Sequence, residues 1–267
     1  MTPPGGKVKA PPDAGAGVPE LALETFAKVD LKDALVLVAF PTTGSASSIA
    51  AHYLVKHLGL PLVGHILTAE MAGIMAIQDG QATSALRIFG GETKCRLDKG
   101  CPRIYVVMTE LALPPLATLR IADGLLAWAK EGDAHLVLAL EGVVRGEGDL
   151  TPDVFCAAAK PDVLKELKKT GIPAMERALI GGITSHLLLV GPARGVRAGA
   201  LLVEASRDHP DGRAAAALIE TLARLMPDVP IDPKPLMKEA MELDEQIKRT
   251  QAAAEATLAT GMPHQYI

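Results

Sequence analysis

The chain has few aromatic residues: four Phe, three Tyr and one Trp make up 3% of its 267 residues, although 49% are hydrophobic. Proteins that bind single-stranded nucleic acid stack bases on aromatic side chains, and this chain has too few for that purpose. It also lacks an excess of basic residues, since 27 Lys and Arg stand against 31 Asp and Glu, a net charge of -4. We therefore expect neither nucleic acid nor an anionic membrane as a partner, and a core of Ala, Leu, Ile and Val.

The chain has no apolar run of the roughly 20 residues that a helix needs to cross a bilayer. Runs such as Ala34–Phe40 have the length of buried strands. Residues 1–20 are rich in Pro and Gly and lack the apolar stretch of a signal peptide, which predicts a disordered tail. Three cysteines, an odd number, are more typical of a cytosolic protein than of a secreted one. We expect a cytoplasmic protein.

Two periodicities alternate along the middle of the chain. The continuous apolar run at 34–40 indicates a strand buried on both faces, and apolar residues at helical spacing follow in 45–58. The same patterns predict strands at 62–68, 74–77, 85–89, 103–109, 135–140, 154–158 and 200–203, and helices at 114–130, 161–170, 181–190 and 211–225. This alternation predicts an α/β fold with a mostly parallel sheet and helices on both faces.

The domain boundaries follow from composition. We expect a tail over 1–20, one α/β domain over 21–232, a long C-terminal helix over 233–260 and a short tail over 261–267. The apolar seam of that helix is too rich in Ala for an independent coiled coil. It is therefore expected to pack on its own domain or on a sister subunit.

The turn after the first buried strand, Phe40–Ser48, is a candidate ligand site, because ligands of parallel sheets gather at the carboxyl ends of the strands. Gly44, Ser45 and Ser47 would offer N–H groups and hydroxyls to a phosphate or carboxylate at a helix start. No Lys follows, so this is not a Walker A loop. The alternative is that Ser45 caps the helix.

Three glutamates, Glu110, Glu141 and Glu204, also follow predicted strands. Gathered in one crevice, they would bind hydroxyl groups or a cation, or act in acid–base chemistry. The alternative is that each faces solvent or caps the next helix. A second glycine turn, Gly181-Gly182, is expected to permit close packing of the backbone.

The sequence lacks the residue patterns that several kinds of catalytic and metal sites require. No Gly-x-Ser-x-Gly elbow occurs, so a hydrolase nucleophile has no candidate. The seven His residues show no ligand spacing, so no metal and no cofactor is expected. Cys95 and Cys101 bracket a short loop; we expect free thiols, with a local disulfide as the alternative, and we place Cys156 in the core.

The chain ends in Gln265-Tyr266-Ile267. A tyrosine one residue from a free carboxylate combines an aromatic group for a pocket with an anion for a basic side chain, which is one way to anchor a peptide on a partner. The alternative is a frayed terminus without a role.

The turn Phe40-Pro41-Thr42-Thr43-Gly44-Ser45-Ala46-Ser47 resembles the Pro-Gly-x-Gly-Asn-Val-Gly signature of the proteasome assembly chaperone family, in the branch of the eukaryotic second chaperone and its archaeal homologues. The helix segment 49–54 is similar too, as are 182–188, 201–204 with 210–215, and 231–236. The resemblance runs from about Leu31 to Gln251. Thr42, Ser45 and Ser47 stand where the family has glycines and Asn.

This resemblance implies an α/β fold like that of purine nucleoside phosphorylases and assembly into homo-oligomers. It implies binding to proteasome α-subunits rather than catalysis. Several archaeal members end in a hydrophobic–Tyr–any tripeptide that docks between α-subunits, so the resemblance makes Gln265, Tyr266 and Ile267 the candidate docking residues, with Gln265 in the hydrophobic position.

We therefore expect a chaperone-like binding protein for proteasome α-subunits rather than an enzyme. The alternative is a small-molecule binder or enzyme that uses the crevice at the strand ends, with Gly44, Ser45 and Ser47 on an anion and Glu204 on a hydroxyl group.

Overall fold

The computed structural model describes residues 20–238, apart from 72–73, 79, 94–96, 99, 145–151, 228 and 230. The predicted tail over 1–20 lies outside the described residues except for Glu20, and the predicted tail over 261–267 and most of the predicted C-terminal helix lie outside them too. Its first residues, Lys234–Lys238, are helical.

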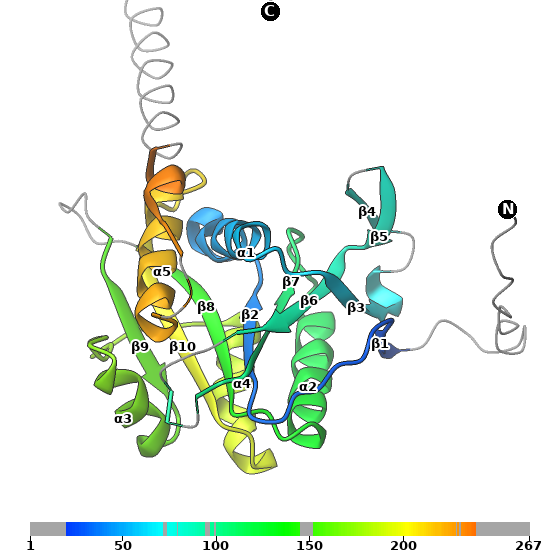
Figure 1. Ribbon diagram of the computed structural model, residues 1–267, viewed down its shortest axis with the longest axis horizontal. Helices are drawn as coiled ribbons and strands as arrows, with labels where there is room; N and C mark the ends of the chain where they lie inside the picture. Colours follow the sequence, from blue (N-terminus) through cyan, green and yellow to red (C-terminus); the bar gives the residue numbers. More distant parts are fainter. Residues whose placement is uncertain are drawn as a thin grey trace, which may run out of the picture.

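The described residues form an eight-stranded sheet with a parallel centre (Figure 1). The strands pair in parallel from β7 through β2 and β8 to β10, and antiparallel at both edges. Across the sheet they lie in the order β1 (Leu21–Thr25), β3 (Leu62–Thr68), β6 (Leu86–Glu92), β7 (Arg103–Met108), β2 (Leu35–Ala39), β8 (Leu136–Val144), β10 (Ala198–Ala205) and β9 (Val154–Ala158).

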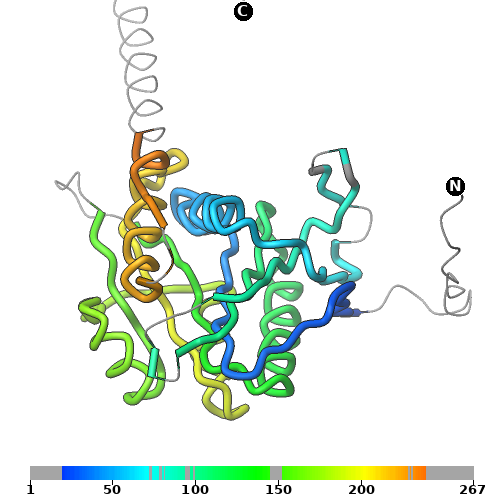
Figure 2. Tube along the Cα trace, viewed as in Figure 1, coloured from blue at the N-terminus to red at the C-terminus, as the bar shows by residue number. Residues whose placement is uncertain are grey.

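Helices cover both faces of the sheet, as the sequence predicts. One face carries α1 (Ala46–His57), α3 (Pro161–Lys169) and α5 (Gly212–Leu225). The other carries α2 (Pro115–Glu131) and α4 (Gly182–Val190). The trace in Figure 2 shows α1 and α5 side by side although about 155 residues of sequence separate them, and both belong to the same apolar cluster.

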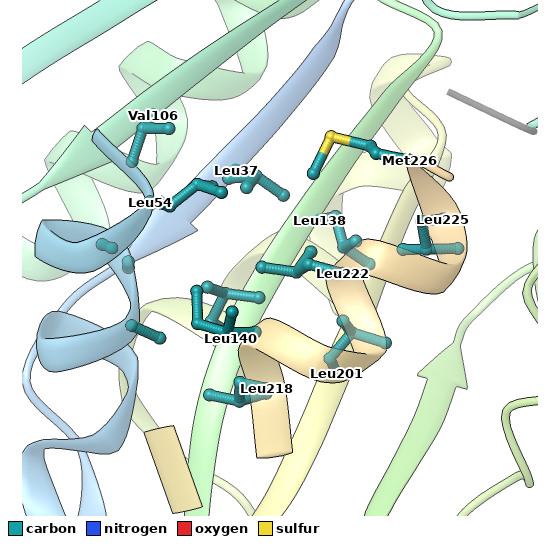
Figure 3. Packing of buried hydrophobic residues seen from close by; sticks show 14 of the residues in the cluster. Leu37, Leu54, Val106, Leu138, Leu140, Leu201, Leu218, Leu222, Leu225 and Met226 are labelled. Carbon is teal, nitrogen blue, oxygen red and sulfur yellow. The ribbon is translucent and has the colours of Figure 1, made fainter. Parts of the chain in front are cut away.

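The core between α5 and the sheet is aliphatic, as the composition predicts. Leu218 and Leu222 of α5 pack on the leucines of β8 and β10, and Leu54 of α1 extends this layer over β2 (Figure 3). These leucines are 0–1% exposed. Truncating one of them to Ala is expected to lower the free energy of unfolding by about 2–5 kcal/mol.

The sequence patterns found the central elements but not the antiparallel edges. β1 was not predicted, and the segment taken as a single short strand at 74–77 is one arm of a hairpin, β4 (Met75–Gln78) and β5 (Gln81–Ser84). Gly80 lies in the two-residue connection with φ +77°, a conformation such hairpins favour. β3, β6 and β7 run antiparallel, because their connections contain no crossover helix.

The cysteines differ from one another. Cys101 is fully buried and disulfide-bonded, so the expected free thiol is wrong at this position. Cys95 lies outside the described residues. Cys156 is free and fully buried, which confirms its place in the core, and burial raises the pKa of its thiol.

Candidate functional site

A cavity of about 270 Å³ lies at the carboxyl end of the parallel strands. It forms between the turn after β2, the segment after β7, the middle of β8 and the start of α4. This is where ligands of parallel sheets are expected. Its walls are Phe40, Pro41, Thr42, Leu111, Ala112, Leu113, Thr118, Glu141, Gly181, Gly182 and Ile183.

The hydroxyl groups of the turn after β2 bond to the protein itself. Ser47 is fully buried and its hydroxyl donates to the carbonyl oxygen of Phe40 over 2.5 Å. The hydroxyl oxygens of Thr42 and Ser47 lie 3.0 Å apart, and Thr42 Oγ1 accepts the N–H of Gly142 over 2.8 Å. These bonds fasten the turn to β8.

Gly44 and Ser45 shape the start of α1 through positive φ angles of 64° and 49°. A Cβ atom at Gly44 would lie 2.9 Å from the Cβ of Asp211, so a glycine is needed here. The N–H of Asp211 donates to the carbonyl oxygen of Gly44 over 2.7 Å. Ser45 occupies the N-cap position, but its side chain makes no capping hydrogen bond, so the predicted capping role of that side chain is wrong.

The three strand-end glutamates do not gather in one crevice. Glu141 lines the cavity, whereas Glu110 and Glu204 are not among its walls. Glu110 makes ion pairs with Arg87 and His52. Burial would raise the pKa of Glu110, but the hydrogen bond from His52 and the charge of Arg87 outweigh it and hold the pKa below its ordinary value. Glu204 lies in β10, half-buried, opposite Val143.

Glu141 is the ionisable residue of the cavity wall. It is 9% exposed, and its Oε2 accepts the hydroxyl of Thr184 over 2.6 Å. Oε1 has no hydrogen-bond partner among the residues that the structure describes. Burial raises the pKa of Glu141 to about 7, and the bond from Thr184 offsets only part of that effect.

The start of α4 forms the opposite polar part of the wall. Its N-cap residue, Gly181, supplies no side-chain hydrogen bond, and Gly182 has φ +63°. The N–H groups of Gly182 and Ile183 have no acceptor within the described part of the chain. A Cβ atom at Gly181 or Gly182 would meet nothing within 4 Å, so the predicted close-packing role of this glycine turn is wrong.

The sequence did not point to Thr184 or to the segment Leu111–Leu113 as parts of a site. Thr184 lies in the segment 182–188 that resembles the family, but the resemblance gave it no ligand role, and Leu111–Leu113 belongs to no motif. Only the folded chain brings both to the cavity that Glu141 lines. The predicted docking residues Gln265, Tyr266 and Ile267 lie outside the described residues. Within the described ranges, no group of three or more His, Cys, Asp or Glu side chains is placed to hold a metal ion. No helix in those ranges has the length and apolar character for crossing a membrane.

Solved structures with this fold define the class of protein. The chain is similar to PbaA of Pyrococcus furiosus, an archaeal homologue of proteasome-assembly chaperone, with 26% identity, a TM-score of 0.78, and 91% of this chain and 96% of PbaA covered. It is also similar to PbaB of the same organism, an archaeal proteasome activator, with 19% identity, a TM-score of 0.74, and 87% and 99% covered.

The particular family follows from the sequence itself. The chain belongs to the PAC2 family, whose model matches residues 36–251. An uncharacterized protein of Methanocaldococcus jannaschii is 23% identical over 222 residues, which cover 83% of this chain and 87% of that protein. The resemblance to proteasome assembly chaperones and the α/β fold are thereby confirmed.

Proposed function

We propose that this protein is a proteasome assembly factor that binds proteasome α-subunits. The observation that carries the proposal is the likeness to PbaA, which extends over 91% of this chain and 96% of that one. Family membership over residues 36–251 supports it independently. A homologue of a proteasome-assembly chaperone with the same extent and fold is expected to recognise proteasome subunits.

The proposed contact is the C-terminal tripeptide Gln265-Tyr266-Ile267. Tyr266 would supply an aromatic anchor and the terminal carboxylate of Ile267 a charge for a basic side chain between α-subunits. A homo-oligomer, also proposed here, would present several such tails at once and strengthen attachment to a ring without any further contact.

Deletion of Tyr266 and Ile267 tests the tail. The full chain and the truncated chain are compared for retention of purified α-rings from the same organism, with His264→Ala as a control that changes the residue before the tripeptide. Loss of an aromatic anchor is expected to weaken retention about 30-fold or more, and His264→Ala is expected to leave it unchanged. Equal retention by the truncated and full chains would remove the tail from the proposal, whereas no retention by the full chain would overturn α-subunit binding.

The alternative ligand site, with Gly44, Ser45 and Ser47 on an anion and Glu204 on a hydroxyl group, stays a prediction. The hydroxyl of Ser47 is bonded to Phe40 and Thr42, and none of the four residues lines the cavity.

A further inference from the structure

The wall of the 270 Å³ cavity is mostly apolar; apart from the hydroxyls of Thr42 and Thr118, which bond within the protein, it has two polar places. Its hydrophobic residues include Phe40, Leu111, Leu113 and Ile183, and no Lys, Arg or His among the described residues belongs to it. A pocket of this kind takes a ligand with an apolar body that is oriented by a small number of polar groups.

The first polar place is the carboxyl group of Glu141. The residue is 9% exposed and lines the cavity, and its Oε1 is open to solvent with no partner among the described residues. A carboxyl oxygen that is open to a cavity can accept a hydrogen bond from a ligand group that replaces water there. A positively charged donor suits it best, because no basic side chain in the wall neutralises it.

The second polar place is the start of α4, where the N–H groups of Gly182 and Ile183 have no acceptor in the described structure. Free N–H groups at a helix start favour a carboxylate or another anion. The hydroxyl of Thr184, two residues after Gly182, donates to Glu141. The acidic and the N–H-bearing parts of the wall are therefore held next to each other.

We propose that this cavity binds a free α-amino acid with a small apolar side chain. The ammonium group would donate to Oε1 of Glu141, and the carboxylate would accept the N–H groups of Gly182 and Ile183. The side chain would lie against Leu111 and Leu113. An α-amino acid carries an ammonium group and a carboxylate on one carbon, so it can bind the carboxyl of Glu141 and the N–H groups at the start of α4 at the same time. A simple amine or a simple carboxylic acid can bind only one of the two.

Size and charge argue against a nucleotide or a sugar phosphate. The volume of about 270 Å³ lies below the range of about 300–1,000 Å³ that larger ligands occupy. Phosphate sites combine helix N–H groups with Lys or Arg, and here the nearest ionisable wall residue is an acid. The proposal does not depend on proteasome binding, because it uses none of the residues of the proposed docking tail.

The test is isothermal titration of the full-length protein with L-leucine at pH 8, where the carboxyl of Glu141 is mostly ionised. Two analogues accompany it: 4-methylpentanoate, which lacks the ammonium group, and 3-methylbutylamine, which lacks the carboxylate. L-leucine is expected to bind at least tenfold more tightly than either analogue, because each loses one charged set of hydrogen bonds. L-aspartate is expected not to bind, because its side chain would place a second carboxylate among leucines.

Glu141→Gln tests the residue itself, since the amide keeps an acceptor for Thr184 and nearly the same shape. It is expected to weaken L-leucine binding about tenfold or more, whereas Glu92→Gln, the same change at an exposed position in β6 outside the cavity wall, is expected to leave it unchanged. Circular dichroism of both variants checks that they are folded. No heat of binding with millimolar L-leucine, or equal affinity in Glu141→Gln, would overturn the proposal, as would binding of 3-methylbutylamine as tight as that of L-leucine.

Discussion

Two buried glutamates on opposite faces of the sheet have opposite electrostatic surroundings. Glu166 of α3 is 2% exposed and Glu141 of β8 is 9% exposed. Burial by itself raises the pKa of both. Yet the pKa of Glu166 lies at about 2 and that of Glu141 at about 7. Several partners lower the pKa of Glu166 against the effect of burial, whereas a single hydrogen bond opposes the effect of burial at Glu141.

Glu166 is surrounded by donors. His135 Nε2 lies 2.7 Å from its Oε1, the N–H of Asp98 donates to the same oxygen over 2.7 Å, and Arg197 makes an ion pair with Oε2. Together these outweigh burial and lower the pKa. Glu141 has the hydroxyl of Thr184 alone. A buried carboxyl with a full set of charged partners serves the fold, whereas one with a free oxygen beside a cavity is available to a ligand.

The largest effect is expected from Glu166→Gln. The amide accepts the N–H of Asp98 but loses the ion pair with Arg197, which keeps Asp162 as a partner, so the free energy of unfolding at pH 7 is expected to fall by about 3 kcal/mol. Urea denaturation measures it. Glu131→Gln, the same change at an exposed position in α2, is expected to alter stability by less than about 0.5 kcal/mol.

The difference in stability between the natural chain and Glu166→Gln is expected to depend on pH. The folded pKa of Glu166 is depressed from 4.5 to about 2, so its stabilisation is present above about pH 4.5 and is lost as the pH falls from there toward 2. The difference in stability between the natural chain and Glu166→Gln should shrink across this window. A difference that stays constant from pH 6 to pH 3 would contradict the role given to this carboxylate.

Glu141→Gln is expected to act in the opposite direction. The folded pKa is raised from 4.5 to about 7, so the folded state binds the proton more tightly and the natural chain loses stability as the pH rises from about 4.5 through 7. The variant cannot ionise and is expected to be more stable at pH 8 by about 2–3 kcal/mol, with little difference at pH 4. Thermal or urea unfolding at both pH values measures it, and an equal effect at the two would refute the buried-charge explanation.

The smallest effect is expected from Thr184→Val, which keeps the shape of a fully buried side chain and removes the one hydrogen bond to Glu141. The pKa of Glu141 should rise further, and stability at pH 8 should fall by about 1 kcal/mol. Titration of the Glu141 carboxyl carbon by NMR measures the first. Ser185→Ala, which removes the neighbouring exposed hydroxyl, should leave that titration in place; a titration of Glu141 unchanged in Thr184→Val would show that the bond is not formed.

The central elements could be predicted because their signals are local. β3 spans Leu62–Thr68 and β9 spans Val154–Ala158, the ranges that the apolar runs indicate, and α2 follows its helical periodicity. β1 could not be found in this way, because an edge strand with exposed residues at its end is fixed by pairing with β3 rather than by an apolar run of its own.

Only the location of the candidate site could be predicted from the sequence. The sequence placed ligand chemistry at the carboxyl ends of the strands and included Glu141 among the acids there, and the cavity lies at that edge. For the serines of the turn after β2, the sequence left open whether they bind a ligand or cap the helix. In the structure the hydroxyl of Ser47 donates to the carbonyl oxygen of Phe40 within the turn. Hydrogen-bond partners of this kind depend on exact side-chain positions that no spacing rule contains.

The sequence by itself determined the aliphatic core, the alternation of strands and helices, and membership of the PAC2 family through residues 36–251. Tertiary structure alone decided which of the two buried glutamates has the lowered pKa and which the raised one. His135 and Arg197 each lie 31 residues from Glu166 in sequence, and Thr184 lies 43 residues from Glu141. The pKa of a buried carboxyl depends on the groups within a few ångströms of it, and folding brings those groups together from distant parts of the chain.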